Sequence, residues 1–282
     1  MLDLHIHSTA SDGTLTPTRI VALAKRRGFS LISVTDHDTM EGVEEALRAG
    51  EEYGVEVVPG VEISAGVDLE VHMLGYGARP DHPIMKSMME DMASARVERM
   101  LKTIENLKNM GIDITREEVE ALAGGVIGRP HIARVLIAHG VVPDVRTAFR
   151  EYIGVGAKAY VERRKVTSEQ VIKNILAAGG LPVLAHGGLL KISEQELNQW
   201  IDHMTAVGLK GLECYHNAHT PAMEKMLRRA AERNGLLVTG GSDFHGSTRP
   251  DIELGSGLGR WSDCQSCRGR FLKALEQAQQ HS

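Results

Sequence analysis

The sequence predicts an α/β protein: a barrel of parallel strand–helix units interrupted by a helical insertion. Short apolar runs alternate with amphipathic segments near both ends of the chain, whereas the middle shows helical periodicity and few β signals. The 282 residues suit a barrel of about 250 residues with a modest insertion. Apolar residues make up 42% and aromatic residues 4%, so aliphatic side chains must fill the core.

The first 80 residues alternate strand and helix. The expected strands are Met1–His7, Leu31–Thr35, Val55–Val61 and Val71–Gly75, and the expected helices are Pro17–Arg27 and Val43–Tyr53. Thr16 is a natural N-cap, and Pro17 occupies the first helical position, where its missing N–H costs nothing. Short loops between such units indicate a parallel sheet.

The middle of the chain predicts helices only. Met85–Met110 is one long amphipathic segment whose methionines at helical spacing indicate core or interdomain packing. Thr115–Ala123 opens with the capping-box pattern, and Pro130–His139 and Pro143–Tyr152 are two shorter helices. We therefore assign residues 80–159 to a helical insertion, expected to cap the substrate site, and residues 1–79 and 160–282 to the barrel domain.

Strand–helix alternation returns in the last third of the chain. The expected helices are Ser168–Ala178, Ser193–Val207 and Pro221–Asn234, and the expected strands are Leu181–Ala185, Gly211–Tyr215 and Leu236–Thr239. The whole chain thus carries seven β runs, followed by a Gly-rich turn and a closing helix.

Charge and hydropathy exclude several classes of function. The formal net charge is −5, whereas a duplex-binding protein needs a basic surplus to neutralise phosphates. A small phosphorylated substrate or the end of a single strand remains compatible with this charge. No apolar run reaches the roughly 20 residues of a membrane span, and no signal peptide precedes the first strand, so we expect a cytoplasmic protein without a membrane partner.

Three cysteines are too few for a disulfide framework. Cys264 and Cys267 form a lone CxxC pair without the second pair that a zinc site needs. We interpret this pair as incidental, with a redox or zinc role as the alternative.

Residue types that bind metals recur where the β runs end. His5 and His7 alternate with period two, so both imidazoles lie on one face of their strand. Glu62 is a carboxylate within an apolar strand end, which requires a cation or several donors to offset its desolvation. The full set of candidate ligands is His5, His7, Asp12, His37, Glu62, His72, His186, Asp243 and His245.

The gathering of these residues is the argument for a metal site. A single histidine at a strand end is usually a hydrogen-bonded, half-buried side chain. In a parallel barrel, however, all strand carboxyl ends share one face, so six such ends would bury many polar groups together with nothing to coordinate. The sequence therefore predicts a cluster of divalent ions held by His, Asp and Glu.

These motifs resemble those of the PHP (polymerase and histidinol phosphatase) superfamily. The matching segments are residues 3–8, 11–13, 35–38, 59–64, 72, 185–186 and 242–245, in the family's order. The resemblance implies a distorted (β/α)7 TIM-like barrel with two or three divalent ions, which could be Mn, Fe or Zn. It also implies three ligand sets: His5, His7, Glu62 and Asp243; Asp12, His37 and His245; and Glu62, His72 and His186.

The helical insertion is similar to that of one PHP subgroup, which includes nucleoside 3′,5′-bisphosphate phosphatases and 5′-to-3′ exoribonucleases. Arg129, in Gly128-Arg129-Pro130-His131, resembles an insert motif and is a candidate fork for phosphate. Lys158 and His219 are further phosphate candidates, and His216, after the strand Gly211–Tyr215, could reach a metal or a phosphate oxygen. Arg96 and Arg99 are interpreted as the solvated face of the long helix, with a position facing the cleft as the alternative.

The expected reaction is metal-assisted hydrolysis of a phosphomonoester by activated water. Asp36 or His216 could assist proton transfer at the leaving oxygen. The expected substrate is a nucleoside 3′,5′-bisphosphate or the 5′-phosphorylated end of a short RNA. Two alternatives remain open: a phosphatase for another small metabolite, such as histidinol phosphate, and a metal-binding scaffold without activity.

Overall fold

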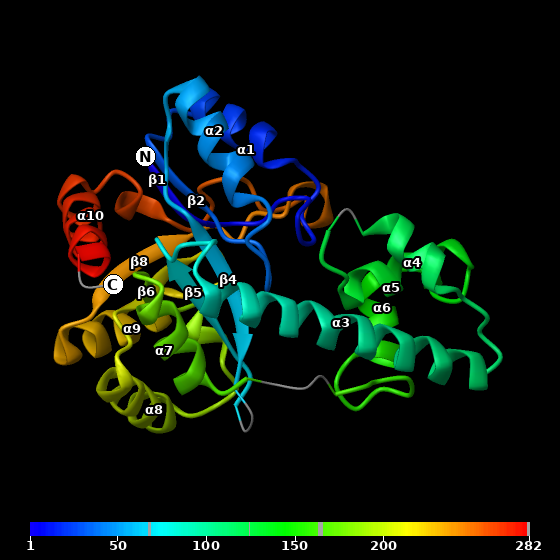
Figure 1. Cartoon of the computed structure of the whole chain (residues 1–282). Helices are drawn as coiled ribbons and strands as arrows, with labels where there is room; N and C mark the ends of the chain where they lie inside the picture. Colours follow the sequence, from blue (N-terminus) through cyan, green and yellow to red (C-terminus); the bar gives the residue numbers. More distant parts are fainter. Residues whose placement is uncertain (67–68, 124, 163–165, 281–282) are drawn as a thin grey trace.

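The computed structural model of the chain describes residues 1–66, 69–123, 125–162 and 166–280. Two sheets and the helices around them form one body, and a lobe of helices projects from its side (Figure 1). The strands are β1 Leu2–Ile6, β2 Leu31–Val34, β3 Glu56–Val57, β4 Gly60–Ala65, β5 Val71–Tyr76, β6 Leu181–Leu184, β7 Gly211–His216 and β8 Leu237–Gly241. The α/β class predicted from the sequence is confirmed.

The helices follow the predicted order. They are α1 Pro17–Arg26, α2 Val43–Tyr53, α3 Pro83–Asn109, α4 Arg116–Leu122, α5 Arg129–Ala138, α6 Val145–Ala148, α7 Ser168–Ala177, α8 Glu194–Val207, α9 Pro221–Asn234 and α10 Gln265–Gln280. Phe149–Ile153 adds a π-helical turn after α6. The predicted caps explain several starts: Thr16 accepts a hydrogen bond from the Arg19 backbone, and Thr115 and Glu118 form a capping box.

The sheets differ from a wholly parallel arrangement. One sheet has the parallel order β1-β2-β3. The other has the order β4-β5-β6-β7-β8, in which β5 is antiparallel to both β4 and β6. Isolated bridges join Ile6 to Phe244 and His37 to Glu62, so the edges of the two sheets meet at two points.

Two sequence expectations about the strands were therefore wrong. The run Val55–Val61 is two strands, because Pro59 separates β3 from β4 and cannot donate to a ladder. The strand at Val71 is not parallel to its neighbours. Only residues 66–70 connect β4 to β5, and a parallel crossover needs a dozen residues or more.

A close approach between β8 and β1 depends on Gly241. A Cβ atom at this position would lie 2.0 Å from the Cβ of His5, which no side chain could tolerate. Glycine thus lets the end of β8 pack directly against β1. Backbone bonds from Asp243 to His5 and from His7 to Phe244 then fix the two segments together.

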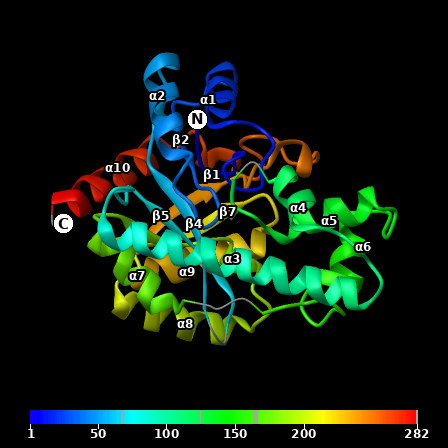
Figure 2. The same cartoon turned by 45° about the vertical axis from the view of Figure 1, so that its right-hand side comes forward.

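Helix α3 links the sheets to the helical lobe (Figure 2). Met85, Met88 and Met92 in its first half belong to the core cluster beneath the second sheet. Met100 and Leu107 in its second half belong to a separate cluster with α4, α5 and α6. The methionine stripe is therefore packing surface, as its spacing predicted.

Helix α10 lies on the opposite side of the body from the lobe (Figures 1 and 2). Its Phe271 ring packs edge-on against the Tyr76 ring of β5, with centroids 5.2 Å apart. The Tyr76 hydroxyl in turn donates to the Leu4 carbonyl of β1. Within the described residues, no helix is long and apolar enough to cross a membrane.

Candidate metal centre

The nine predicted ligands converge at one end of the sheets. Six of them follow or end β1, β2, β6 and β8, and Asp12 lies on the loop after β1. Glu62 lies within β4, where it pairs with Leu74 of β5. His72 joins the group because β5 runs antiparallel, which places the start of that strand at this end. The reversal that the sequence analysis missed thus supplies a ligand position.

Glu62 lies at the middle of the group. Its Oε2 is 3.2 Å from the Nε2 atoms of both His5 and His7 and 2.9 Å from Nδ1 of His37. Its Oε1 is 2.8 Å from Nδ1 of His72 and 3.0 Å from Nε2 of His186. The two oxygens therefore face different histidines, so Glu62 could contribute to the binding of more than one ion.

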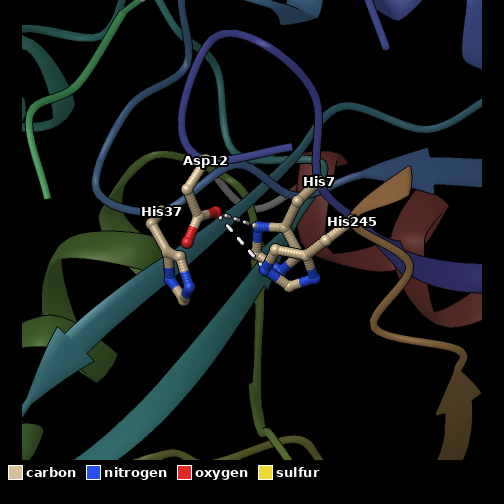
Figure 3. Close-up of side chains that lie close together, drawn as sticks. All are labelled: His7, Asp12, His37 and His245. Atoms are coloured by element: carbon tan, nitrogen blue, oxygen red, sulfur yellow. Dashed lines mark ion pairs between the residues drawn. The ribbon is translucent and has the colours of Figure 1, made fainter. Parts of the chain in front are cut away.

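Asp12 and Asp243 also lie beside His7. Nε2 of His7 is 3.2 Å from Oδ1 of Asp243, and Nε2 of His245 is 3.3 Å from Oδ1 of Asp12. Figure 3 shows His7, Asp12, His37 and His245 converging, with the Asp12 carboxylate facing the rings of His7 and His245.

Electrostatics favour a charged carboxylate at the centre. Burial alone would raise the pKa of Glu62, but the imidazoles of His37, His5 and His72 hold that pKa well below its ordinary value. Glu62 is 1% exposed, so few waters can solvate it. A buried anion of this kind needs positive charge beside it.

The backbone around the centre is strained. Asp38, His186 and Asp243 have φ angles of 53°, 31° and 55°, in the left-handed region that favours glycine. His186 and Asp243 are predicted ligands, and Asp38 follows His37 directly. Such conformations persist where surrounding structure imposes them, and they cluster at functional sites.

The donor set fits divalent metal ions. Three groups place their ligand atoms within 4.8 Å of one another: His7, Asp12, His37 and His245; His5, His7 and Asp243; and His37, Glu62 and His72. Within the described part of the chain, buried Nδ1 of His7 and His37, Nε2 of His245 and Oε2 of Glu62 make no hydrogen bond. Cations shared by these atoms would satisfy them, and imidazole with carboxylate suits first-row divalent metals.

Glu213 is a functional candidate that the sequence analysis missed. It lies in β7 with no exposed surface. Its Oε1 is 3.0 Å from Nδ1 of His5, and its Oε2 accepts the backbone N–H of His186 at 2.7 Å. A proton on Nδ1 of His5 leaves Nε2 as a lone pair facing Glu62. A carboxylate inside an apolar strand, the signal that identified Glu62, could have revealed it.

We expect Glu213→Gln to weaken metal affinity about 10- to 100-fold, because an amide orients the His5 ring less strongly than a carboxylate does. Equilibrium dialysis against Mn²⁺ or Zn²⁺ measures this affinity. Glu232→Gln, on the exposed end of α9, is the matched control. An affinity equal to that of the control would remove Glu213 from the metal centre.

Asp36, a predicted catalytic residue, supports a loop. Its Oδ1 accepts from the backbone of Ser8 and the hydroxyl of Ser11, at 2.7 and 2.6 Å, and its Oδ2 accepts from the hydroxyl of Ser8 at 2.6 Å. These bonds hold the loop that carries Asp12. The geometry thus favours a positioning contribution over direct proton transfer.

His216 and His219 lie beside the cluster. Nδ1 of His216 accepts the backbone N–H of Ala218 at 3.1 Å, and its Nε2 is 3.4 Å from Oδ2 of Asp243. Nδ1 of His219 is 3.0 Å from the Cys214 carbonyl, which requires a proton on that nitrogen. The two rings lie 5.3 Å apart, and both side chains are buried.

A cavity of about 230 Å³ opens over the centre. Asp12, His37 and His72 line it from the cluster, and Arg96, Arg99, Arg129 and Arg249 line it with positive charge. Arg129 lies over the rings of Phe149 and Tyr160 at 5.4 and 5.9 Å. The predicted fork for phosphate is thus at the cavity.

Three other basic side chains have surroundings that differ from those of Arg129. Arg96 is not solvated: it is 9% exposed and pairs with the buried carboxylate of Asp38. Arg249, which the sequence analysis did not single out, pairs with Oδ2 of Asp243. Lys158 is exposed, lies over the Tyr152 ring, and is not among the residues that line the cavity.

An α/β fold with a buried His–carboxylate centre beneath an arginine-lined cavity defines a metal-dependent phosphoesterase. The PHP domain family model matches residues 3–165. The chain belongs to the PHP family, and it is a hydrolase of phosphoric ester bonds.

The chain is similar to two named relatives and to a solved structure. A 5′-3′ exoribonuclease of Haemophilus influenzae is 34% identical over 86% of this chain and 89% of its own length. A 3′,5′-nucleoside bisphosphate phosphatase of Chromobacterium violaceum is 33% identical over 86% of this chain and 87% of its own. A crystal structure from Bifidobacterium adolescentis, described as a metal-dependent phosphoesterase, covers 97% of this chain and 96% of its own with a TM-score of 0.86 and 35% identity.

Proposed function

We propose that this enzyme removes the 3′-phosphate of nucleoside 3′,5′-bisphosphates and also acts on the 5′-phosphorylated end of short RNA. The observation that carries the proposal is the cavity, which the candidate metal ligands Asp12, His37 and His72 line together with Arg99, Arg129 and Arg249. A substrate with two phosphates would present one phosphate to the bound ions and the other to the arginines. The names of the two curated relatives support the same substrates.

We further propose that the centre binds two or three ions of Mn, Fe or Zn. His5, His7, Glu62 and Asp243 would hold one ion; Asp12, His37 and His245 a second; and Glu62, His72 and His186 a third. The observed groups differ in detail, since His37 also lies with Glu62 and His72. When bound, such ions acidify a water molecule and offset charge on the phosphoryl oxygens.

The protein's own residues orient the substrate in this proposal. Arg129 is fixed by the rings beneath it and by a hydrogen bond to the Ile153 carbonyl at 3.4 Å. Its planar guanidinium can bind phosphate through two parallel N–H donors. A fixed donor loses less rotamer freedom when it binds.

His216 would donate a proton to the leaving oxygen. Its Nδ1 is occupied as an acceptor of the Ala218 N–H, so the neutral ring has its proton on Nε2. That nitrogen faces Asp243. A nitrogen that bears a proton is a donor and not a metal ligand. His216 would therefore contribute a proton to the reaction without binding metal. His219 has the opposite tautomer and supports the Cys214 carbonyl.

The helical insertion at residues 80–159 would cap the substrate. Arg96, Arg99, Arg129 and Phe149 line the cavity from the insertion, and Asp12 and Arg249 line it from the sheets. The pair between Arg96 and Asp38 anchors the long helix beside the centre. The two bridges between sheet edges favour a distorted barrel beneath this cap. We also propose that the enzyme acts in the cytoplasm.

A metal-supplemented substrate screen tests the proposal. We expect kcat/KM to be highest for adenosine 3′,5′-bisphosphate or short 5′-phosphorylated RNA, and at least tenfold lower for histidinol phosphate. Preference for histidinol phosphate would favour a metabolite phosphatase. A metal-loaded protein that hydrolyses none of the three, nor a generic aryl phosphate, would favour the scaffold.

We expect Arg129→Ala to raise KM for the bisphosphate by tenfold or more, because a charge-assisted bidentate contact contributes about 1.5–3 kcal/mol. Steady-state kinetics with saturating Mn²⁺ measures it. Arg150→Ala removes an exposed guanidinium from the same lobe and is the matched control. A KM equal to that of the control would place the phosphate elsewhere.

We expect His216→Gln to lower kcat by about 10²- to 10⁴-fold, the usual range for loss of a general acid. Bound metal should stay at the wild-type level, because the nitrogen of His216 that faces the site, Nε2, bears a proton and cannot bind an ion. Metal analysis of the purified variant distinguishes a general acid from a metal ligand. Loss of one ion per chain would show that His216 is a ligand instead.

A further inference from the structure

Cys264 and Cys267 form a second chemical site, whose chemistry differs from that of the metal centre. They are joined by a disulfide across two residues, with Cα atoms 5.2 Å apart. Both are half-buried, while the intervening Gln265 and Ser266 are exposed. Small reagents in solution can therefore reach the pair.

The N-terminus of α10 and the guanidinium of Arg270 place positive charge beside the two sulfur atoms. The pair lies at the N-terminus of the 16-residue helix α10, where the Arg268 backbone N–H donates to the Cys264 carbonyl. The backbone N–H of Cys267 lies 3.3 Å from Sγ of Cys264, and Nη2 of Arg270 lies 3.7 Å from Sγ of Cys267. A helix N-terminus and a nearby arginine both favour a thiolate over a thiol.

The third cysteine has the opposite environment. Cys214 is fully buried in β7, and burial raises the pKa of its thiol well above the ordinary value. Glu213 beside it acts in the same direction. The chain therefore contains an inert thiol that serves as an internal control.

The disulfide is not needed to hold α10 in place. It closes a loop with a sequence separation of only 3, and short loops restrict the unfolded chain least. Phe271 and Leu275 bury the helix against the body, and Arg268 pairs with Glu56 of β3. A bond with so small a structural contribution can open and close without unfolding the protein.

We propose that Cys264 and Cys267 are a reversible dithiol–disulfide couple that exchanges with low-molecular-weight disulfides and thiols. In the oxidising direction the Cys264 thiolate attacks one sulfur of the external disulfide, and one external thiolate leaves. The Cys267 thiolate then attacks the Cys264 sulfur, forms the internal disulfide and releases the second thiolate. Two electrons pass from the protein to the external disulfide, and the two cysteine protons pass to the released thiols.

Alkylation and mass spectrometry of the whole chain test this proposal. The folded protein is equilibrated with reduced and oxidised glutathione in defined ratios, quenched with acid, alkylated and digested with trypsin. Cleavage after Arg260 and Arg268 yields one peptide with both cysteines, and cleavage after Lys210 and Lys225 yields another with Cys214. We expect the first peptide to convert fully between two forms. In reduced glutathione both cysteines are alkylated, and in oxidised glutathione the peptide is unalkylated and two hydrogens lighter than the free dithiol peptide.

Single variants separate the two steps. Cys267→Ser should accumulate one glutathione per chain on Cys264, because the resolving sulfur is gone. In the folded wild-type protein, Cys214 should take up neither glutathione nor the alkylating reagent. If the pair stays doubly alkylated in oxidised glutathione, or if Cys267→Ser takes up no more glutathione than Cys214 does, the pair is not a redox site. Neither result depends on phosphoesterase activity.

Discussion

Removal of divalent metal is expected to abolish phosphoester hydrolysis, down to the rate of the buffer blank. Among the described residues, the metal cluster has no P-loop, serine nucleophile elbow or reactive cysteine beside it. The proposed reaction therefore depends on ions held by Glu62 and its histidine neighbours. Dialysis against a chelator, followed by an aryl-phosphate assay, measures the loss.

Addition of Mn²⁺, Fe²⁺ or Zn²⁺ in slight excess should restore turnover. The melting temperature should rise at the same time, because an ion that binds only the folded chain stabilises it by mass action. Adding Ca²⁺ at the same concentration is the control, since calcium prefers sites made only of oxygen ligands. Full activity of the dialysed protein, with no metal detectable by elemental analysis, would contradict the account.

Glu62→Gln is expected to lower kcat by at least about 10³-fold, in the range seen when a single preorganised electrostatic contact is lost. The amide keeps the shape of the side chain but removes its charge and one of its two acceptor oxygens. Histidines on both sides would lose the carboxylate that now lies within 3.2 Å of them. Bound metal should fall by at least one ion per chain.

Kinetics and elemental analysis of one preparation check both parts of this expectation. Glu52→Gln, on the exposed side of α2, is the matched control for the loss of one carboxylate. Circular dichroism and the melting temperature establish that each variant is folded. Wild-type metal content and kcat in folded Glu62→Gln would remove Glu62 from the site.

The sequence predicted features that depend on local signals. Helix starts at Pro17 and Arg116 followed from caps, because a cap is satisfied by residues within one turn. The nine metal candidates were found because each lies in or beside a β run, and the structure brings them together, His186 through its contact with Glu62. These patterns require only the period of a strand and the polarity of its end.

Features that depend on distant partners were not predicted. The reversed direction of β5 follows from a short loop and from pairing with β6, more than 100 residues later in the chain. Arg96 was interpreted as part of a solvated helix face, and only the fold brings Asp38 to it. Glu213 was overlooked because its partner, His5, lies 208 residues away. The periodicity of a sequence shows which face of a helix or strand is apolar, but not which other element packs against that face.

The direct test is a crystal structure of the protein grown with Mn²⁺, with anomalous scattering used to locate the ions. We predict at least two peaks in the cluster, with one ion at each oxygen of Glu62 and ligand distances of about 2.0–2.3 Å to imidazole and carboxylate atoms. His216 should lie outside every coordination sphere. Anomalous peaks elsewhere on the molecule, with none among His7, Glu62 and Asp243, would contradict the assignment of this cluster as the metal centre.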